Sequence, residues 1–245
     1  MEPSLVCILS YGLMCSPGDV VREVPPAVPL VAAADVETPA AKSAEPVRGQ
    51  ASLLLAKVQS FYDSTRDLEA KFTQTYIHPV YGTKTVNKGK LRVKKPGYMV
   101  WDYDKDENPD FYVEGDRIWV VERDTKQVIT KDVGSSDIAG AEKFLFGGRQ
   151  LIDDFQVKLA GDALEKRYGM PGHTSIVLKP KRKNAHYAEL LLVVDDATGR
   201  VDAFIVRNTD KSTNHFVLSD LSTNVGLQTS DVKFNRPKGY TLIKG

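Results

Sequence analysis

The chain has 245 residues, of which 42% are apolar and 27% are charged. This composition is typical of a folded globular protein and excludes a wholly disordered or fibrous chain. Thirty-three lysines and arginines against 32 acidic residues leave a net charge of +1, which gives no electrostatic indication of a nucleic-acid partner.

The first 48 residues differ from the rest. The apolar stretch within residues 1–15 is too short to span a bilayer as a helix and resembles the end of an export signal. Both cysteines, Cys7 and Cys15, lie in it, and Cys15 is a candidate for lipid attachment. Residues 16–48 are rich in Pro and Ala without a periodic apolar face, so we expect a disordered linker there and a single domain over 49–245.

The first half of that domain begins with a helix and continues as strands. Apolar residues at helical spacing predict a helix over 50–63. From residue 67 the apolar period changes to two, and turn residues separate the segments. This pattern predicts antiparallel strands over 67–78, 84–94, 98–103, 110–114, 117–122 and 127–133.

The second half repeats the pattern after a helical interruption. A capped apolar segment predicts a helix over 136–146, and a short helical turn follows over 149–153. Further strands are predicted over 155–159, 174–179, 188–195, 200–207, 212–221 and 232–234. A mainly β (α+β) chain of about 11–12 strands and three short helices leaves two architectures, a sandwich or one curved sheet closed by its helices.

Catalytic signatures are absent from the sequence. It contains no HExxH, GxSxG, GxGxxG, Walker A or paired CxxC motif. The histidines, which are isolated from one another along the chain, are interpreted as surface or packed residues: His78, His173, His186 and His215.

An acidic run over 102–110 imitates the start of a calcium loop, with Asp at alternate positions. Glu107 and Val113 stand where such a loop needs glycine and an acid, so a solvated turn is favoured. We therefore predict no enzyme, no metal site and no cofactor.

Two predicted strands each present an apolar face. Alternation places Met99, Trp101 and Tyr103 on one face of strand 98–103, and Leu91 and Val93 on one face of the preceding strand. These residues alone favour the core of an ordinary sandwich.

Four strings in this region and at the C-terminal end carry a family resemblance. They are Phe72-Thr73-Gln74, Gly89-x-Leu91-x-Val93-Lys94-Lys95-Pro96-x-Tyr98-x-x-Trp101-x-Tyr103, Val113-x-Gly115-Asp116-x-Ile118-Trp119 and Phe234-x-x-Pro237-x-Gly239-Tyr240. In order and spacing they resemble the periplasmic outer-membrane lipoprotein carrier family of the LolA type, over about residues 50–245.

The resemblance implies a single incomplete antiparallel barrel with a lid of short helices over an apolar cavity. The cavity residues that it implies are Phe72, Leu91, Val93, Met99, Trp101, Val113 and Ile118. The implied lid residues are Ile138, Ala141, Phe144 and Leu145. Lys95 stands where the family usually has an arginine that holds the lid closed, and a lysine lacks the planar fork of donors.

The same resemblance implies a function. It predicts a non-catalytic, monomeric carrier in the periplasm of a Gram-negative bacterium that takes acylated lipoproteins from an inner-membrane ABC-type release complex to an outer-membrane acceptor. Two alternatives stay open: a lipid-anchored acceptor of lipoproteins, tethered through Cys15, and a non-catalytic domain of the same fold that senses lipid or peptide.

Overall fold

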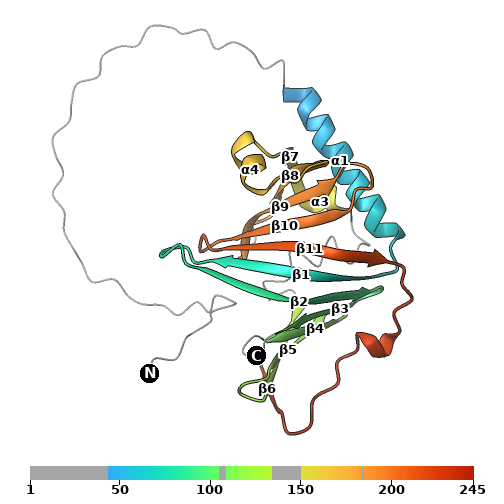
Figure 1. Ribbon diagram of the computed structural model, residues 1–245, viewed down its shortest axis with the longest axis vertical. Helices are drawn as coiled ribbons and strands as arrows, with labels where there is room; N and C mark the ends of the chain where they lie inside the picture. The colour runs from blue at the N-terminus through green and yellow to red at the C-terminus, as the bar shows by residue number, and fades with distance from the viewer. Residues whose placement is uncertain (1–43, 105–108, 134–149, 184) are drawn as a thin grey trace, which may run out of the picture.

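One open sheet of twelve strands dominates the structure (Figure 1). The computed structural model describes residues 44–104, 109–133, 150–183 and 185–245. The strand order is β12-β6-β5-β4-β3-β2-β1-β11-β10-β9-β8-β7, with β12 parallel to β6 and the other pairs antiparallel. The strands are β1 (Asp67–Ile77), β2 (Lys84–Lys94), β3 (Tyr98–Tyr103), β4 (Asp110–Glu114), β5 (Arg117–Glu122), β6 (Gln127–Asp132), β7 (Phe155–Leu159), β8 (His173–Pro180), β9 (Tyr187–Asp195), β10 (Val201–Asn208), β11 (Thr213–Thr223) and β12 (Thr241–Lys244).

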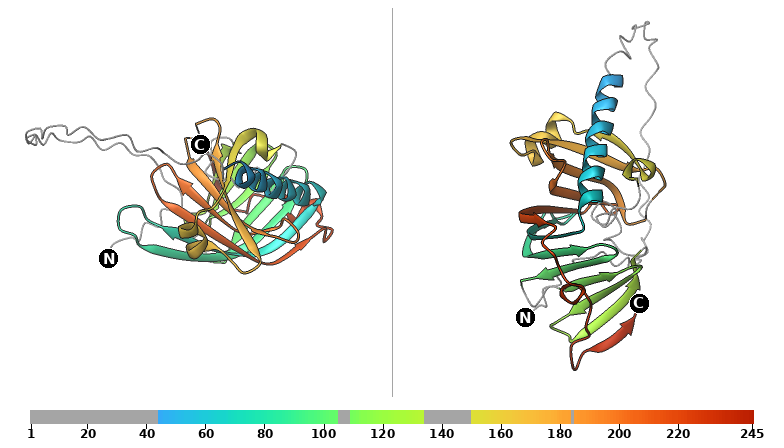
Figure 2. Two further views of the ribbon diagram at one scale, coloured as in Figure 1. Left: turned by 90° about the horizontal axis from the view of Figure 1, so that it is seen from above. Right: turned by 90° about the vertical axis from the view of Figure 1, so that its right-hand side faces the viewer.

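Helix α1 (Ala44–Ser64) lies across the concave side of the curved sheet (Figure 2). Its buried apolar face consists of Ala51, Leu55, Val58 and Tyr62, each at most 1% exposed, at the spacing of a helix face. The helix begins before the predicted residue 50 and takes in residues 44–48 of the predicted linker. Pro46 is compatible with this start because the first turn of a helix needs no hydrogen bond from its N–H groups.

Two shorter helices follow in the described part of the chain. Helix α3 (Leu151–Asp154) corresponds to the predicted turn over 149–153, whereas the predicted helix over 136–146 lies outside the described residues. Helix α4 (Asp162–Tyr168) was not predicted. It packs Leu164 and Tyr168 against a separate apolar cluster on the convex face of β8, β9 and β10. Its acidic first turn and basic last turn were a usable signal.

The predicted strand over 232–234 is wrong. Residues 232–234 follow a 3₁₀ turn, η3 (Thr229–Asp231), and form no strand; β12 extends the sheet further along the chain. Phe234 stacks on Trp119 with ring centroids 5.1 Å apart, and its backbone N–H donates to Glu114. Alternation at 232–234 therefore reflects side-chain packing onto the sheet and not a hydrogen-bonded ladder.

Of the two architectures left open by the sequence, the single curved sheet is the one observed. The main apolar cluster fills the space between the concave face and α1. The prediction of a mainly β fold with an open sheet is confirmed. None of the helices among the described residues is both long enough and apolar enough to cross a membrane.

Candidate functional site

The predicted cavity residues lie together on the concave face. They are 0–3% exposed and belong to one apolar cluster: Phe72, Leu91, Val93, Met99, Trp101, Val113 and Ile118. Strand register explains this, because Val93 pairs with Met99, Met99 with Val113 and Val113 with Ile118. The predicted lid residues lie outside the described residues.

Aromatic side chains form the centre of this face. The Phe72 ring lies 5.0 Å from Trp101 and 4.9 Å from Tyr103, both in edge-to-face geometry. Phe204 and Phe216 stack on each other at 4.7 Å, and Phe216 lies 5.1 Å from Trp101. Phe204 and Phe216 were missed by sequence reasoning, because their place beside Trp101 depends on the pairing of β11 with β1 and with β10.

The glycine in the longest family string has a packing role. Gly89 lies opposite Phe72 on one side and Tyr103 on the other. A Cβ atom at this position would lie 2.2 Å from the backbone oxygen of Asp102 and 2.7 Å from the Phe72 ring. A residue without a side chain therefore lets the Phe72 ring pack against strand β2.

Buried amides border the aromatic centre on one side. The Gln74 Nε2 donates to Asn214 Oδ1 at 2.8 Å, while its Oε1 accepts from Tyr103 Oη at 2.9 Å and from Asn87 Nδ2 at 3.4 Å. Burial, and then the charge of Asp110, raises the pKa of Tyr103, so its hydroxyl stays a hydrogen-bond donor. This network gives the apolar face a polar boundary.

The acidic run interpreted as a solvated turn is instead partly an ion-pair cluster. Arg123 Nε donates to Asp110 at 2.8 Å, and Arg123 Nη2 donates to the Tyr103 carbonyl at 2.7 Å and lies 3.4 Å from Asp102. Asp110 also accepts from the Tyr103 N–H at 2.9 Å. Arg123 therefore fixes the end of β3 against β4.

Several polar contacts attach α1 to the rest of the domain. The Lys95 ammonium donates to the Tyr62 carbonyl in the last turn of α1, and Lys57 donates to the Asp196 carbonyl. Gln59 accepts from the Leu151 N–H at 2.9 Å. Burial lowers the pKa of Lys95, and the nearby Asp63 carboxylate partly offsets this.

Lys95 thus contacts α1, while its predicted role as a lid latch remains a prediction. A pocket of about 540 Å³ opens beside it and is also lined by Asp63, Thr65 and Pro96. Solvent therefore reaches the C-terminal end of α1 next to this contact.

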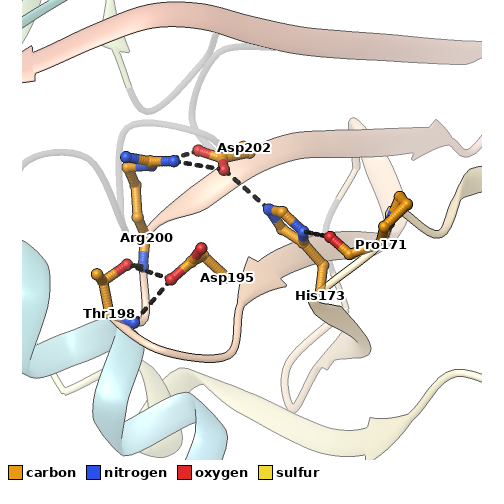
Figure 3. A network of polar contacts seen from close by, with 6 residues as sticks. All are labelled: Pro171, His173, Asp195, Thr198, Arg200 and Asp202. Carbon is orange, nitrogen blue, oxygen red and sulfur yellow. Dashed lines mark hydrogen bonds and ion pairs between the residues drawn. The ribbon is translucent and has the colours of Figure 1, made fainter.

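A polar cluster that sequence reasoning missed joins the start of β8 to the β9–β10 turn (Figure 3). Asp202 accepts two hydrogen bonds from Arg200, at 2.5 and 2.8 Å, and one from His173 Nε2 at 2.8 Å. His173 Nδ1 lies 2.9 Å from the Pro171 carbonyl. Asp195 accepts from both the N–H and the hydroxyl of Thr198.

The ligating atoms of His173, Asp195 and Asp202 lie within 4.8 Å of one another, a spacing that a metal ion could use. The surrounding contacts favour an ion-pair cluster. Both nitrogens of the His173 ring face oxygen acceptors, which leaves no lone pair for a metal when the ring is protonated. Burial alone would lower the pKa of His173, but hydrogen bonds to Asp202 and Pro171 and the carboxylate charges raise it overall.

Replacing His173 with glutamine is expected to reduce the pH dependence of stability. A folded-state pKa above the unfolded value of about 6.5 means that protonated His173 stabilises the fold fully below that pH and loses this contribution as pH rises through the folded-state pKa. In urea unfolding, the contribution of His173 should therefore make the free energy of unfolding of the parent higher at about pH 5.5 than at about pH 8.5. His173→Gln should remove this contribution. The control is His186→Gln, and equal pH profiles for His173→Gln and the parent would contradict the expectation.

The sequence matches a known protein family and several of its members. Residues 63–235 match the family model described as "Outer membrane lipoprotein carrier protein LolA". The outer-membrane lipoprotein carrier protein of Methylococcus capsulatus is 23% identical over 189 residues, which cover 77% of this chain and 86% of that protein. The protein of the same name from Chromobacterium violaceum is 22% identical over 220 residues, covering 90% of this chain and 98% of that protein.

Among solved structures, an uncharacterized conserved protein from Thermus thermophilus has a similar fold. Its TM-score is 0.51 at 10% sequence identity, and the match covers 80% of this chain and 99% of that chain.

Proposed function

We propose that this chain carries lipoproteins by holding their acyl chains against its concave apolar face. The chain belongs to the LolA family of outer membrane lipoprotein carrier proteins, which supports this proposal. The observation that carries the proposal is the continuous apolar cluster between an open sheet and α1. Because the sheet does not close on itself, its apolar face is covered by helix α1. This helix can move away without breaking hydrogen bonds between the strands.

Water makes a carrier necessary for this cargo. At about 0.8 kcal/mol per methylene, three acyl chains of roughly 15 methylenes each would cost more than about 30 kcal/mol to expose. A lipoprotein released from a membrane therefore needs an apolar surface of comparable extent before it crosses an aqueous space.

Loading requires a rearrangement, because the face is covered in this structure. Trp101 is 3% exposed, and Met99 is completely buried. We infer that acyl chains replace the contacts made by the apolar face of α1. The contacts of Lys57 and Lys95 are hydrogen bonds from ammonium groups to backbone carbonyls, and water can replace the partner of each. The buried hydrogen bond from the Leu151 N–H to Gln59 must also break, which requires water to reach both groups.

The cellular setting is part of the proposal. Family membership supports a periplasmic protein of a Gram-negative bacterium that is loaded by an inner-membrane ABC-type release complex and unloaded at an outer-membrane acceptor. We expect it to act as a monomer. Mass spectrometry of the mature N-terminus from soluble and membrane fractions tests for a lipid tether at Cys15, and a soluble, cleaved form favours the carrier over the lipid-anchored acceptor.

A binding experiment tests the acyl-chain proposal directly. The purified chain is mixed with a fluorescent triacylated lipopeptide and separated by gel filtration in detergent-free buffer. We expect the lipopeptide to elute with the monomer in a one-to-one complex, whereas the same peptide without acyl chains elutes alone. Equal recovery of both peptides with the protein, or of neither, contradicts the proposal.

A further inference from the structure

The hairpin between β1 and β2 presents apolar side chains to solvent at its tip. Val80 is 77% exposed and Tyr81 is 79% exposed, the highest values for large apolar residues within the described part of the chain. Val86, on β2 just behind the tip, is 50% exposed. Three exposed apolar side chains gathered at one turn form a patch, and such a patch indicates an interaction surface.

The tip has an ordered conformation. The N–H groups of Val80 and Tyr81 point to His78 Nδ1, at 3.2 and 3.4 Å, and the N–H of Gly82 donates to the His78 carbonyl at 3.0 Å. The ring of Tyr81 stacks on that of His78 at a centroid distance of 5.0 Å. Little conformational entropy is therefore lost when these side chains enter an apolar environment.

The hairpin is also basic along its length. Residues 67–94, from the start of β1 to the end of β2, contain six lysines and arginines and two acidic residues, Asp67 and Glu69, which lie at the end of the hairpin away from its tip. Alternation places Lys84, Lys88 and Lys90 on the same exposed face of β2 as Val86. None of these three lysines forms an ion pair with another residue in the described ranges, and the nearby Asp102 is engaged by Arg92 and Arg123.

We propose that the β1–β2 hairpin docks on the surface of an anionic lipid bilayer. Val80 and Tyr81 enter the boundary between headgroups and acyl chains, where tyrosine is favoured because one end of its ring is apolar and the other polar. Lys84, Lys88 and Lys90 then lie near lipid phosphates, and each basic residue near such a surface adds attraction. Exposed lysines beside an exposed apolar tip match the two parts of an anionic bilayer surface, the negative headgroups and the acyl chains below them.

This inference goes beyond the proposed acyl-chain binding and does not depend on it, since the hairpin tip is separate from the concave face. Vesicles without lipoprotein test it. The full chain is floated with vesicles of phosphatidylethanolamine containing one third phosphatidylglycerol, and with vesicles of phosphatidylcholine alone. We expect binding to the anionic vesicles that weakens as salt is added.

Matched variants assign the binding to the hairpin. The double substitution Val80→Ser and Tyr81→Ser should lower the partition coefficient by roughly tenfold or more. Leu53→Ser is the control for lost apolar surface, because Leu53 is 74% exposed on α1. Lys84→Glu and Lys88→Glu should each lower the coefficient by roughly fivefold or more, and Lys233→Glu and Lys238→Glu, which lie elsewhere on the surface, serve as charge controls.

All variants keep the same N-terminal segment with Cys15, so any membrane binding by that segment is equal in all of them. Differences in binding between the variants therefore report on the hairpin. Three results would overturn the proposal: no binding of the parent to anionic vesicles, equal binding of the tip variant and the parent, or self-association through the tip in place of vesicle binding. The gel-filtration experiment with the lipopeptide distinguishes this failure from a failure of acyl-chain binding.

Discussion

Replacing Met99 with glutamate is expected to abolish lipopeptide binding and to lower the free energy of unfolding by about 3–5 kcal/mol. Met99 is completely buried at the concave face, where its sulfur accepts a hydrogen bond from Trp101 Nε1 at 2.9 Å. A carboxylate there has no positive partner among the described contacts, and it presents a charge to the surface that the acyl chains would occupy.

The neighbouring residue separates lost binding from lost stability. Val100 is equally buried but lies on the opposite face of β3, where its strand partners are Arg92 and Tyr112. Val100→Glu should therefore lower stability without charging the concave face. Binding per folded molecule, measured in a stabilising osmolyte with circular dichroism as the check on folding, should be lost in Met99→Glu and retained in Val100→Glu.

Milder substitutions keep the comparison possible if both glutamate variants unfold. Met99→Gln and Val100→Thr preserve side-chain shape while adding a polar group, at a cost of about 1–3 kcal/mol each. We expect only the first to weaken lipopeptide binding. Equal binding by Met99→Gln and Val100→Thr would show that the concave face is a packed core without a role in binding.

The concave face was predictable because its signal is local. The two-residue period of a strand places Met99 and Trp101 on one side of 98–103, and Leu91 and Val93 on one side of 84–94, whatever the distant pairing is. Family resemblance then added Phe72 and Ile118, which alternation alone could not assign to the same surface. What sequence could not provide was the partner strand, and so Phe216 was missed, since its place beside Trp101 depends on the pairing of β1 with β11.

The His173 cluster illustrates the same limit more sharply. His173 pairs with Asp195 across β8 and β9, and Asp202 comes from the next strand, so each residue is isolated in the sequence. Their meeting requires the register of two hairpins, and a shift of one residue would turn the side chains to opposite faces. Trp119 and Phe234, by contrast, stood in the family strings, but only the structure places them against each other on the convex side.

Replacing Lys95 with leucine is expected to free the C-terminal end of α1. The Lys95 ammonium donates to the Tyr62 carbonyl, one of the last carbonyls of α1, where a positive charge also interacts favourably with the helix dipole. A charge-assisted hydrogen bond of this kind contributes roughly 1.5–3 kcal/mol, so its loss should raise amide exchange in the last turns of α1 by about tenfold or more.

Leucine and arginine at position 95 are expected to have opposite effects on the closure of α1. Lys95→Leu should load lipopeptide but release it slowly, since an apolar side chain under a displaced helix favours the loaded state. Lys95→Arg should keep or strengthen closure, because burial lowers the pKa of Lys95, whereas a guanidinium stays charged and has more donors. Lys94→Leu is the matched control, since Lys94 is also half-buried and directly precedes Lys95 as the last residue of β2.

Hydrogen exchange of α1 and transfer of lipopeptide from loaded protein to acceptor vesicles measure the two effects separately. Faster exchange with slower transfer in Lys95→Leu, and parental behaviour in Lys94→Leu, would establish Lys95 as the residue that holds α1 closed. If Lys95→Leu and Lys95→Arg both match the parent in exchange and in transfer, the contact is a surface charge on a helix end, and the role of the family's arginine does not extend to this lysine.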